Sequence, residues 1–342
     1  MSEIINLDNV VESGDPNYEL VTFSWDLLDV CQYNCSYCSA MNFNLATFAK
    51  HPQAKEAWKH VIKMLSLPTI RTPFCVEILG GEPTLHPNIK DIITQLCSID
   101  NCISVSLITN LAKSLKFYKE LDIESNNKLT IEASYHPEYS NQPYFDKLVE
   151  LNKSDHISII PNINLPSNPE HWERTKTLID GLTDLNLPVG LNLLQSVPDG
   201  DVGGFTPAYT DDFWEYFKDY YVSGDVYQVD ANIESPLNRM HAFLEDHAGS
   251  FTSNISYITK DGETHLYNEA DINKHNLRSF TGWKCKALMY HIDMFGLVTN
   301  HCDRTPVKFL TTNSLTKCRT CVVDHCDCDT KFIYHKTNPD HE

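Results

Sequence analysis

The stretch CQYNCSYC places three cysteines within eight residues, at Cys31, Cys35 and Cys38. Thiolates this close together on one loop are typical ligands of zinc or of an iron–sulfur cluster. Structural zinc takes four ligands, usually from two Cys-x2-Cys pairs, and no second pair lies nearby in the sequence. A cubane 4Fe–4S cluster held through three irons leaves its fourth iron open to a small ligand. From the spacing alone, an open cluster, zinc and accidental clustering all remain possible.

A second group of six cysteines stands near the end of the chain. Cys285 and Cys302 flank a hairpin pattern that turns at Gly296, and four more follow: Cys318, Cys321, Cys326 and Cys328. The N-terminal stretch has no signal-peptide pattern, so we expect the cytoplasm, where clustered thiols bind metal more often than they form disulfides. A zinc site made by the last four cysteines is one interpretation of this group.

The elements that must position these cysteines alternate between short apolar runs and longer helical patterns. Strands are expected at 20–30, 74–79, 103–109, 129–135, 157–164 and 189–195, with helices near 45–65, 87–99, 112–121, 143–153, 168–184 and 210–222. This alternation predicts an α/β fold, an open, partial (β/α)6 TIM-like barrel with helices outside. A small C-terminal cysteine-rich domain is expected to follow it. Chemistry in such barrels lies at the carboxyl ends of the strands.

Glycines and polar residues stand at several of these predicted strand ends. They are Gly80, Gly81 and Glu82 after the second strand, Asn110 after the third, Ser134, Tyr135, His136 and Glu138 at the fourth, and Asn162 and Asn192 on the fifth and sixth. A histidine at a barrel mouth can orient a substrate or take a proton. We therefore expect His136, Tyr135 and Glu138 as catalytic candidates, with a surface loop as the alternative for His136.

Three of these stretches together resemble a known family. CQYNCSYC, ILGGEPTLHP and LITN are similar, in order, spacing and placement, to the motifs of the radical S-adenosylmethionine (SAM) superfamily over about residues 20–200. The resemblance implies that the open iron binds the amino and carboxylate groups of SAM. It also implies that one electron cleaves SAM to a 5′-deoxyadenosyl radical, which abstracts hydrogen from a substrate.

The same resemblance implies roles for individual residues. Gly80 and Gly81 would let the backbone approach the methionine end of SAM, and Glu82 would accept from its ammonium group. Tyr37 would pack near the adenine. The remaining cofactor-binding candidates would meet the carboxylate or ribose of SAM, or the substrate: Asn110, Ser134, Asn162 and Asn192.

The C-terminal cysteines resemble the auxiliary-cluster extensions of this superfamily, called Twitch and SPASM. The Twitch pattern implies one cluster on Cys285, Cys302, Cys318 and Cys321, with Cys326 and Cys328 as extra cysteines. The SPASM pattern holds two clusters with about seven cysteines, one more than this chain offers, and His335 is a candidate for the missing ligand. We expect one auxiliary 4Fe–4S cluster, with two as the alternative, and an overall oxidation of the substrate through it.

The predicted activity is that of an oxidoreductase-like radical SAM enzyme acting on a small molecule or a short peptide. Only about 30 residues precede the first motif, which leaves no room for a peptide leader-binding domain and favours a small substrate. Alternatives are a peptide- or sulfatase-type maturase, a transferase with a sacrificial cluster, and a non-catalytic iron–sulfur scaffold. The expected electron donor is of the flavodoxin or ferredoxin type.

Composition and length set the remaining limits. The net charge of −19 argues against nucleic acid and anionic membranes as partners, and no window of about 18 apolar residues is present. The expected organisation is a radical SAM barrel over 1–222, whose first 18 or so residues are an extension. A linker with a hairpin (223–280), an auxiliary-cluster module (281–335) and a tail (336–342) follow.

Overall fold

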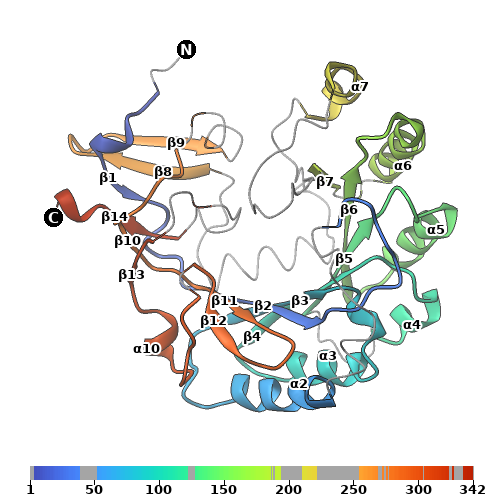
Figure 1. The fold of residues 1–342 in the computed structure, drawn as a ribbon, viewed down its shortest axis with the longest axis horizontal. Coiled ribbons are helices and arrows are strands. Elements are labelled where there is room, and N and C mark those ends of the chain that lie inside the picture. The colour runs from blue at the N-terminus through green and yellow to red at the C-terminus, as the bar shows by residue number, and fades with distance from the viewer. Residues whose placement is uncertain are drawn as a thin grey trace.

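The computed structural model describes most of the chain. The described residues are 4–38, 52–121, 128–185, 187, 189–193, 210–221, 254–268, 272, 275, 277–302, 304–322, 326 and 334–341. They are organised around two sheets, and Figure 1 shows helices α2 to α6 along the outer side of the larger sheet.

Within the described residues, the larger sheet contains six parallel strands in sequence order. They are β2 (Val21–Leu28), β3 (Phe74–Gly80), β4 (Cys102–Thr109), β5 (Leu129–Tyr135), β6 (Ile157–Leu165) and β7 (Gly190–Leu193). Each pairs in parallel with the next. Their bounds agree with the predicted strands to within about two residues, and the end of the last predicted strand lies outside the described residues.

In the described residues, an α-helix lies in the connection between each successive pair of these strands. The helices are α2 (Pro52–Leu65), α3 (Ile89–Cys97), α4 (Leu115–Lys119), α5 (Gln142–Leu151) and α6 (Trp172–Asp184), and α7 (Asp211–Tyr221) follows β7. Shorter helical turns are η1 (Leu7–Asn9), η2 (Pro83–Leu85), η4 (Pro169–His171), α10 (Thr312–Leu315) and η6 (Pro339–His341). The strand–helix alternation confirms the predicted parallel α/β arrangement. Closure into a partial barrel stays a prediction.

The two faces of the larger sheet differ because successive side chains of a strand point to opposite sides. On one face, Phe23, Val76 and Ile131 are fully buried in the core. On the other face, Ser24 is in register with Glu77, and Glu77 with Ser106. The apolar face packs against the helices, so the polar side chains are directed to the opposite side of the sheet.

A hairpin from far along the chain extends the larger sheet at its first edge. This hairpin consists of β11 (Met289–Ile292) and β12 (Val298–Asn300), which pair in antiparallel fashion. β11 runs parallel to β2, with Tyr290 opposite Phe23. The strand that leads into the first cysteine motif and the hairpin between Cys285 and Cys302 are therefore neighbours.

The second sheet collects strands from both ends of the sequence. In spatial order they are β13 (Arg319–Thr320), β10 (Lys284–Cys285), β14 (Lys336–Thr337), β1 (Val10–Ser13), β8 (Asn254–Thr259) and β9 (Thr264–Asn268). The pair β8–β9 is the hairpin predicted in the linker.

The pairing of these strands crosses the expected domain boundaries. The segments expected to be an N-terminal extension and a C-terminal tail contribute β1 and β14, which pair with each other. The hairpin expected inside the cysteine module instead joins the sheet of the predicted barrel. Sequence patterns of two to four residues do not reveal such partners, because a short strand is stabilised by the strands beside it rather than by its own propensity.

Candidate functional site

The loop that carries the first three cysteines leaves the end of β2 and runs against the end of β3. The N–H of Gly81 donates to the carbonyl of Leu28 at 2.8 Å, and the N–H of Glu82 donates to that of Val30 at 2.7 Å. A Cβ added at Gly80 would lie 2.2 Å from the Leu28 oxygen, and one at Gly81 would lie 2.3 Å from the Val30 oxygen. Both glycines are thus required by the close approach of two backbone segments. Their expected contact with SAM stays a prediction.

Glu82 is buried, with 1% of its surface exposed, and its carboxylate accepts four hydrogen bonds. Oε1 accepts from the N–H and hydroxyl of Thr84 at 3.0 and 2.5 Å and from the hydroxyl of Thr109 at 2.7 Å. Oε2 accepts from the N–H of Asn110 at 2.7 Å. Burial raises the pKa of Glu82, and these hydrogen bonds oppose the rise. The carboxylate ties the end of β3 to the end of β4.

Asn110 connects this carboxylate to the cysteine loop. Its Nδ2 lies 3.7 Å from Sγ of Cys31, and its Oδ1 accepts from Nε2 of Gln32 at 3.0 Å and from the N–H of Ala112 at 3.1 Å. Burial raises the pKa of the Cys31 thiol, while the hydrogen bonds from Tyr33 and Asn110 lower it. The structure therefore brings Asn110 to a cysteine. Its predicted contact with SAM is not tested.

Three residues after β5 contact the cysteine loop from another side: His136, Glu138 and Tyr139, which we call the β5 clamp. Glu138 Oε2 accepts from the N–H of Ser36 at 2.9 Å, and Oε1 accepts from the Ser36 hydroxyl. The Tyr139 hydroxyl donates to the Asn34 carbonyl at 2.8 Å. These contacts hold the backbone between Cys31 and Cys38, so a positioning role for Glu138 is visible, whereas a catalytic role stays a prediction.

His136 lies against the cysteine loop. Its Nδ1 is 3.1 Å from the Tyr37 hydroxyl and 3.5 Å from Sγ of Cys35. Burial lowers the pKa of His136 to about 4, although the charge of Glu138 opposes this shift. The imidazole is therefore neutral at neutral pH. Two predicted residues, His136 and Tyr37, are in direct contact, but neither predicted role is tested by this contact.

Tyr135 faces away from the cysteine loop. It is 2% exposed, and its ring packs edge-on against Tyr144 of α5, with 5.4 Å between the centroids. Strand alternation sends Tyr135 to the same side as Ile131 and Ala133, which are both fully buried. The expectation that Tyr135 points to the barrel mouth is therefore wrong, since the side chain belongs to the apolar face of the sheet, and its catalytic role stays an untested prediction.

Two further polar candidates, Ser134 and Asn162, lie on the other face of the sheet. Asn162 donates from Nδ2 to Glu132 at 3.3 Å, and Ser134 is in register with Asn162. Asn192 pairs in register with Asn164, and its side chain lies outside the described residues.

Sequence reasoning missed two carboxylates on this polar face, Glu77 and Glu132. Burial and the charge of Glu132 raise the pKa of Glu77 to about 7, and burial also raises that of Glu132. A carboxyl group with such a pKa can donate or accept a proton at neutral pH. A lone charged residue inside each of the strand runs FCVEILG and LTIEASY was the signal that marked them.

The donor chemistry of the first loop fits an iron–sulfur cluster. Cys31, Cys35 and Cys38 are free thiols, and the N–H of Cys38 donates to the Cys35 carbonyl at 3.1 Å. In the described part of the chain, no three His, Cys, Asp or Glu side chains converge on one position as the ligands of a single ion do. A cubane makes a different demand, because each thiolate binds its own iron. Three thiols on one anchored loop meet that demand.

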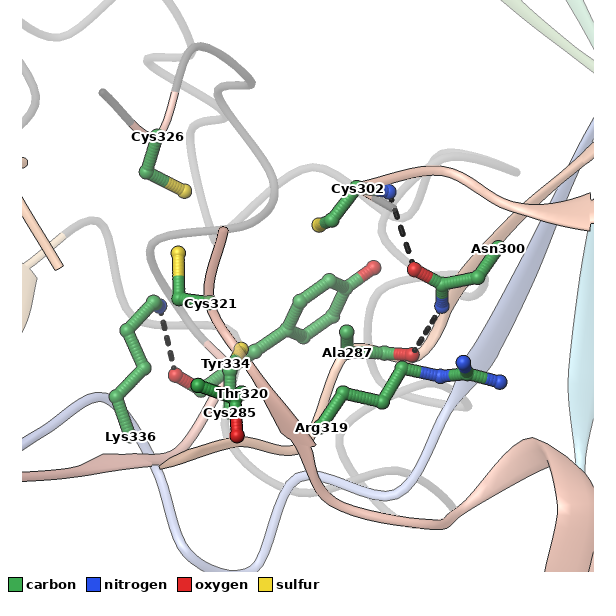
Figure 2. A pocket seen from close by; sticks show the side chains of 10 residues that line it. All are labelled: Cys285, Ala287, Asn300, Cys302, Arg319, Thr320, Cys321, Cys326, Tyr334 and Lys336. Carbon is green, nitrogen blue, oxygen red and sulfur yellow. Dashed lines mark hydrogen bonds between the residues drawn. The ribbon is translucent and has the colours of Figure 1, made fainter. Parts of the chain in front are cut away.

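A second candidate site lies beside β10, in a hollow that is partly open to solvent. Figure 2 shows the cysteines that line it; they are Cys285, Cys302, Cys321 and Cys326. Lys336 on β14 also lines this hollow. Burial raises the pKa of Cys285 to about 11, and the positive charge of Lys336 opposes this rise.

The other expected ligands of this module have different surroundings. Cys318 is exposed and is not among the residues that line the hollow. Nε2 of His335 lies 3.5 Å from the carboxylate of Glu12. Cys328 lies outside the described residues. Tyr334, Arg319 and Lys336 line the hollow and were missed, because their place follows from strand pairing rather than from any motif.

Comparison with known proteins finds distant sequence relatives. No family model matches the chain. The GTP 3',8-cyclase of Stenotrophomonas maltophilia is 21% identical over 203 residues, 58% of this chain and 59% of that protein. The GTP 3',8-cyclase of Microcystis aeruginosa is 30% identical over 87 residues, 25% of each chain. The chain thus spans about three fifths and one quarter of the two curated relatives it matches.

Partial likenesses to solved structures accompany them. Streptococcus suis SuiB has a TM-score of 0.46 at 15% identity, over 87% of this chain and 64% of that chain. BtrN in complex with AdoMet and 2-DOIA has a TM-score of 0.31 at 12% identity, over 68% of this chain and 88% of that chain.

The class of protein follows from the motifs in their places and from the sequence relatives. The three-cysteine loop after β2 and the Gly-Gly-Glu-Pro turn after β3, together with these relatives, identify the chain as a member of the radical SAM superfamily. The Twitch or SPASM assignment of its C-terminal cysteines stays a prediction.

Proposed function

We propose that the chain cleaves SAM reductively to a 5′-deoxyadenosyl radical, which then abstracts hydrogen from a small-molecule or short-peptide substrate. The observation that carries this proposal is the anchoring of one loop with three free thiols by the ends of β3, β4 and β5. Cys31, Cys35 and Cys38 would hold the 4Fe–4S cluster. When bound, this group supplies the one-electron reduction of SAM.

The part of the chain in this chemistry is to position the reactants. Gly80 and Gly81 allow the turn after β3 to lie against the loop, and Glu82 fixes the ends of β3 and β4 in one network. Glu82 would also attract the ammonium group of SAM. Asn110 and the β5 clamp orient Cys31 and the backbone around Cys35, so that the thiols keep their places while the reaction proceeds.

Substrate oxidation is the finer part of the proposal. The four cysteines that line the hollow would hold an auxiliary cluster, which would supply an acceptor for the electron lost by a substrate radical. Glu77 and Glu132, on the polar face of the sheet, would accept the proton released in such an oxidation, because a pKa of Glu77 near 7 suits that task. A flavodoxin- or ferredoxin-type protein would supply the electron that starts each turnover.

A nucleoside triphosphate is the second candidate substrate. The observation that favours it is the name of both curated relatives, GTP 3',8-cyclase. A screen of GTP against uncharged and peptide substrates would separate these candidates, with loss of GTP in a SAM-dependent manner as the result expected of the second one.

The deciding experiment is anaerobic reconstitution with iron and sulfide, followed by dithionite and SAM, with 5′-deoxyadenosine measured by chromatography. We expect product from the parent chain and none from C35A. The matched variant C285A, which changes a buried cysteine of the second group, should keep part of the cleavage. An iron-replete parent chain that leaves SAM intact would contradict the proposal.

A further inference from the structure

We propose that the hollow beside β10 is a cluster site whose four ligands are Cys285, Cys302, Cys321 and Cys326, and that Lys336 balances its negative charge. This assignment rests on the proposed auxiliary cluster. It changes the ligand set that the sequence pattern implies, because Cys326 replaces Cys318. It also gives a task to a lysine that no motif marks.

The choice of Cys326 over Cys318 follows from burial and placement. Cys326 is 6% exposed and lines the hollow together with Cys285, which is also 6% exposed. The N–H of Cys326 donates to the carbonyl of Arg278 at 2.9 Å, which fixes this cysteine beside the second sheet. Cys318 is exposed and does not line the hollow. Cys326, which is buried and lines the hollow, is therefore better placed than Cys318 to be the fourth ligand.

The other ligands are held by backbone hydrogen bonds to the surrounding elements. The N–H of Cys321 donates to the Trp283 carbonyl at 2.7 Å, next to β10. The N–H of Cys302 donates to Oδ1 of Asn300 at 3.1 Å, at the end of β12. Together with Cys285 on β10, these cysteines reach one hollow from three separate segments (Figure 2). Such convergence is what a multinuclear thiolate site requires.

Two cationic residues flank the central cysteine. β10 lies between β13 and β14, and Cys285 is directly opposite Arg319 on one side and Lys336 on the other. Directly opposed residues of antiparallel strands project to the same face. Cys285, Arg319 and Lys336 accordingly all line the hollow.

Lys336 is the more deeply placed of the two cations. It is 1% exposed, its Nζ donates to the Tyr334 carbonyl at 2.9 Å, and it lies 5.0 Å from the ring centroid of Phe280. A buried ammonium group is expensive in free energy, and a nearby anion reduces that cost. The negative charge of four thiolates exceeds the positive charge of an iron–sulfide core, so the cluster with its ligands is an anion. Lys336 and the cluster therefore stabilise one another.

This charge has a consequence for electron transfer. Reduction adds one negative charge to the cluster, and a fixed positive charge nearby favours the reduced form. Lys336 should therefore raise the reduction potential of the cluster. A higher potential makes the second site a better acceptor for an electron from a substrate radical.

The ligand set is tested in a background that lacks the first site. In C31A/C35A/C38A, reconstitution should leave about four irons per chain in the hollow. Adding C326A should remove most of this iron, whereas adding C318A should leave it unchanged. Iron lost from the C318A variant and kept in the C326A variant overturns the ligand set. If the hollow binds zinc in place of iron while the parent chain still cleaves SAM, the proposed auxiliary cluster is wrong but the proposed function stands.

The role of Lys336 is tested by potentiometric titration of the iron–sulfur signal in the same background. K336M should keep its iron, and its midpoint potential should shift to more negative values. K336R should restore the parent value. The control is K286M, because Lys286 is adjacent to Cys285 in sequence but pairs with Glu19 at 3.1 Å. Since K336M replaces a buried residue, R319M serves as a second variant with the same expected direction. If the midpoint potential is unchanged in both K336M and R319M, the proposed effect of the positive charges on the cluster is wrong.

Discussion

Glu138 and Ser36 are joined by two hydrogen bonds, although 102 positions separate them in the sequence. Ser36 stands between Cys35 and Cys38, so the carboxylate after β5 holds the middle of the cysteine loop. If the three cysteines of this loop hold a cluster as proposed, such an anchor would add rigidity, because the bound cluster would not have to order the backbone by itself.

Removal of this anchor should weaken the hold on the cluster. We expect E138A to lose SAM-cleaving activity about tenfold faster than the parent chain when a chelator is present, as outer contacts of metal ligands usually contribute on that scale. E138Q keeps one acceptor oxygen and should lie between the two. E120Q changes an exposed glutamate on α4's C-terminal side and serves as control. If E138A and E120Q lose SAM-cleaving activity at the same rate in the presence of the chelator, the β5 clamp does not stabilise the cluster.

Gly81 should tolerate no side chain. In G81A the new Cβ would meet the Val30 carbonyl, so the turn and the cysteine loop must separate, at a cost of about 3 kcal/mol. G262A is the matched control, because Gly262 has a φ of +83° but nothing within 4 Å of the added Cβ. Its strain alone should cost about 1 kcal/mol. Urea unfolding compares the two, and a smaller loss in G81A than in G262A would contradict this close approach.

Glu82 should reveal two separable tasks. T109V removes one of four hydrogen bonds to the carboxylate, together with the contacts of the same hydroxyl to the Leu111 N–H and the Tyr118 hydroxyl. It should lower the free energy of unfolding by about 2 kcal/mol, while SAM still binds. E82Q replaces the charged acceptor and should lower the free energy of unfolding by about 2 kcal/mol. It should also weaken the binding of SAM. Calorimetric titration of SAM, together with urea unfolding, separates these effects. If E82Q binds SAM as tightly as T109V does, Glu82 acts on the fold alone.

His86 should make stability depend on pH. Burial lowers its pKa to about 4, although the charge of Glu56 opposes this, so the folded chain binds fewer protons than the unfolded chain between about pH 4 and 6.5. The free energy of unfolding must then fall as the pH falls through this window, by about 2 kcal/mol between pH 7 and 5. H86N keeps an acceptor for the Asn88 N–H but does not titrate in this range. The pH dependence of its unfolding, measured against the parent chain, should be smaller by that amount.

The sequence alone predicted the parallel sheet because its strands carry their own signal. β5 was predicted at Leu129–Tyr135, as it is found, since it is a short apolar run with turn residues on both sides. The positions of Cys31, Gly81 and Glu82 at strand ends followed from that sheet. Tyr135 was misplaced because a strand end has two faces, and one residue of register decides which of them a side chain takes.

The second sheet was hidden from sequence reasoning for a different reason. Its strands β10, β13 and β14 are each two residues long and pair across gaps that no local pattern spans. The sequence therefore predicted Lys336 to lie in a tail, although it stands directly opposite Cys285 in the second sheet. The roles of Glu138 and Tyr139 in holding the cysteine loop were also hidden, since hydrogen bonds between distant segments leave no periodicity in the chain.

The pairing of β1 with β14 also bears on the order in which the protein is made. Glu12 and Ser13 precede their partners Thr337 and Lys336 by most of the described sequence, so this pair of strands can form only after the later segment has been synthesised. The pairing of β2 to β7 with one another can form while synthesis continues, because these six strands lie side by side in sequence order. The three-cysteine loop would therefore be in place for the proposed cluster before the later segments are made. The hollow beside β10 needs Cys326 and Lys336 for its lining, so it can be completed only after these later segments have been synthesised.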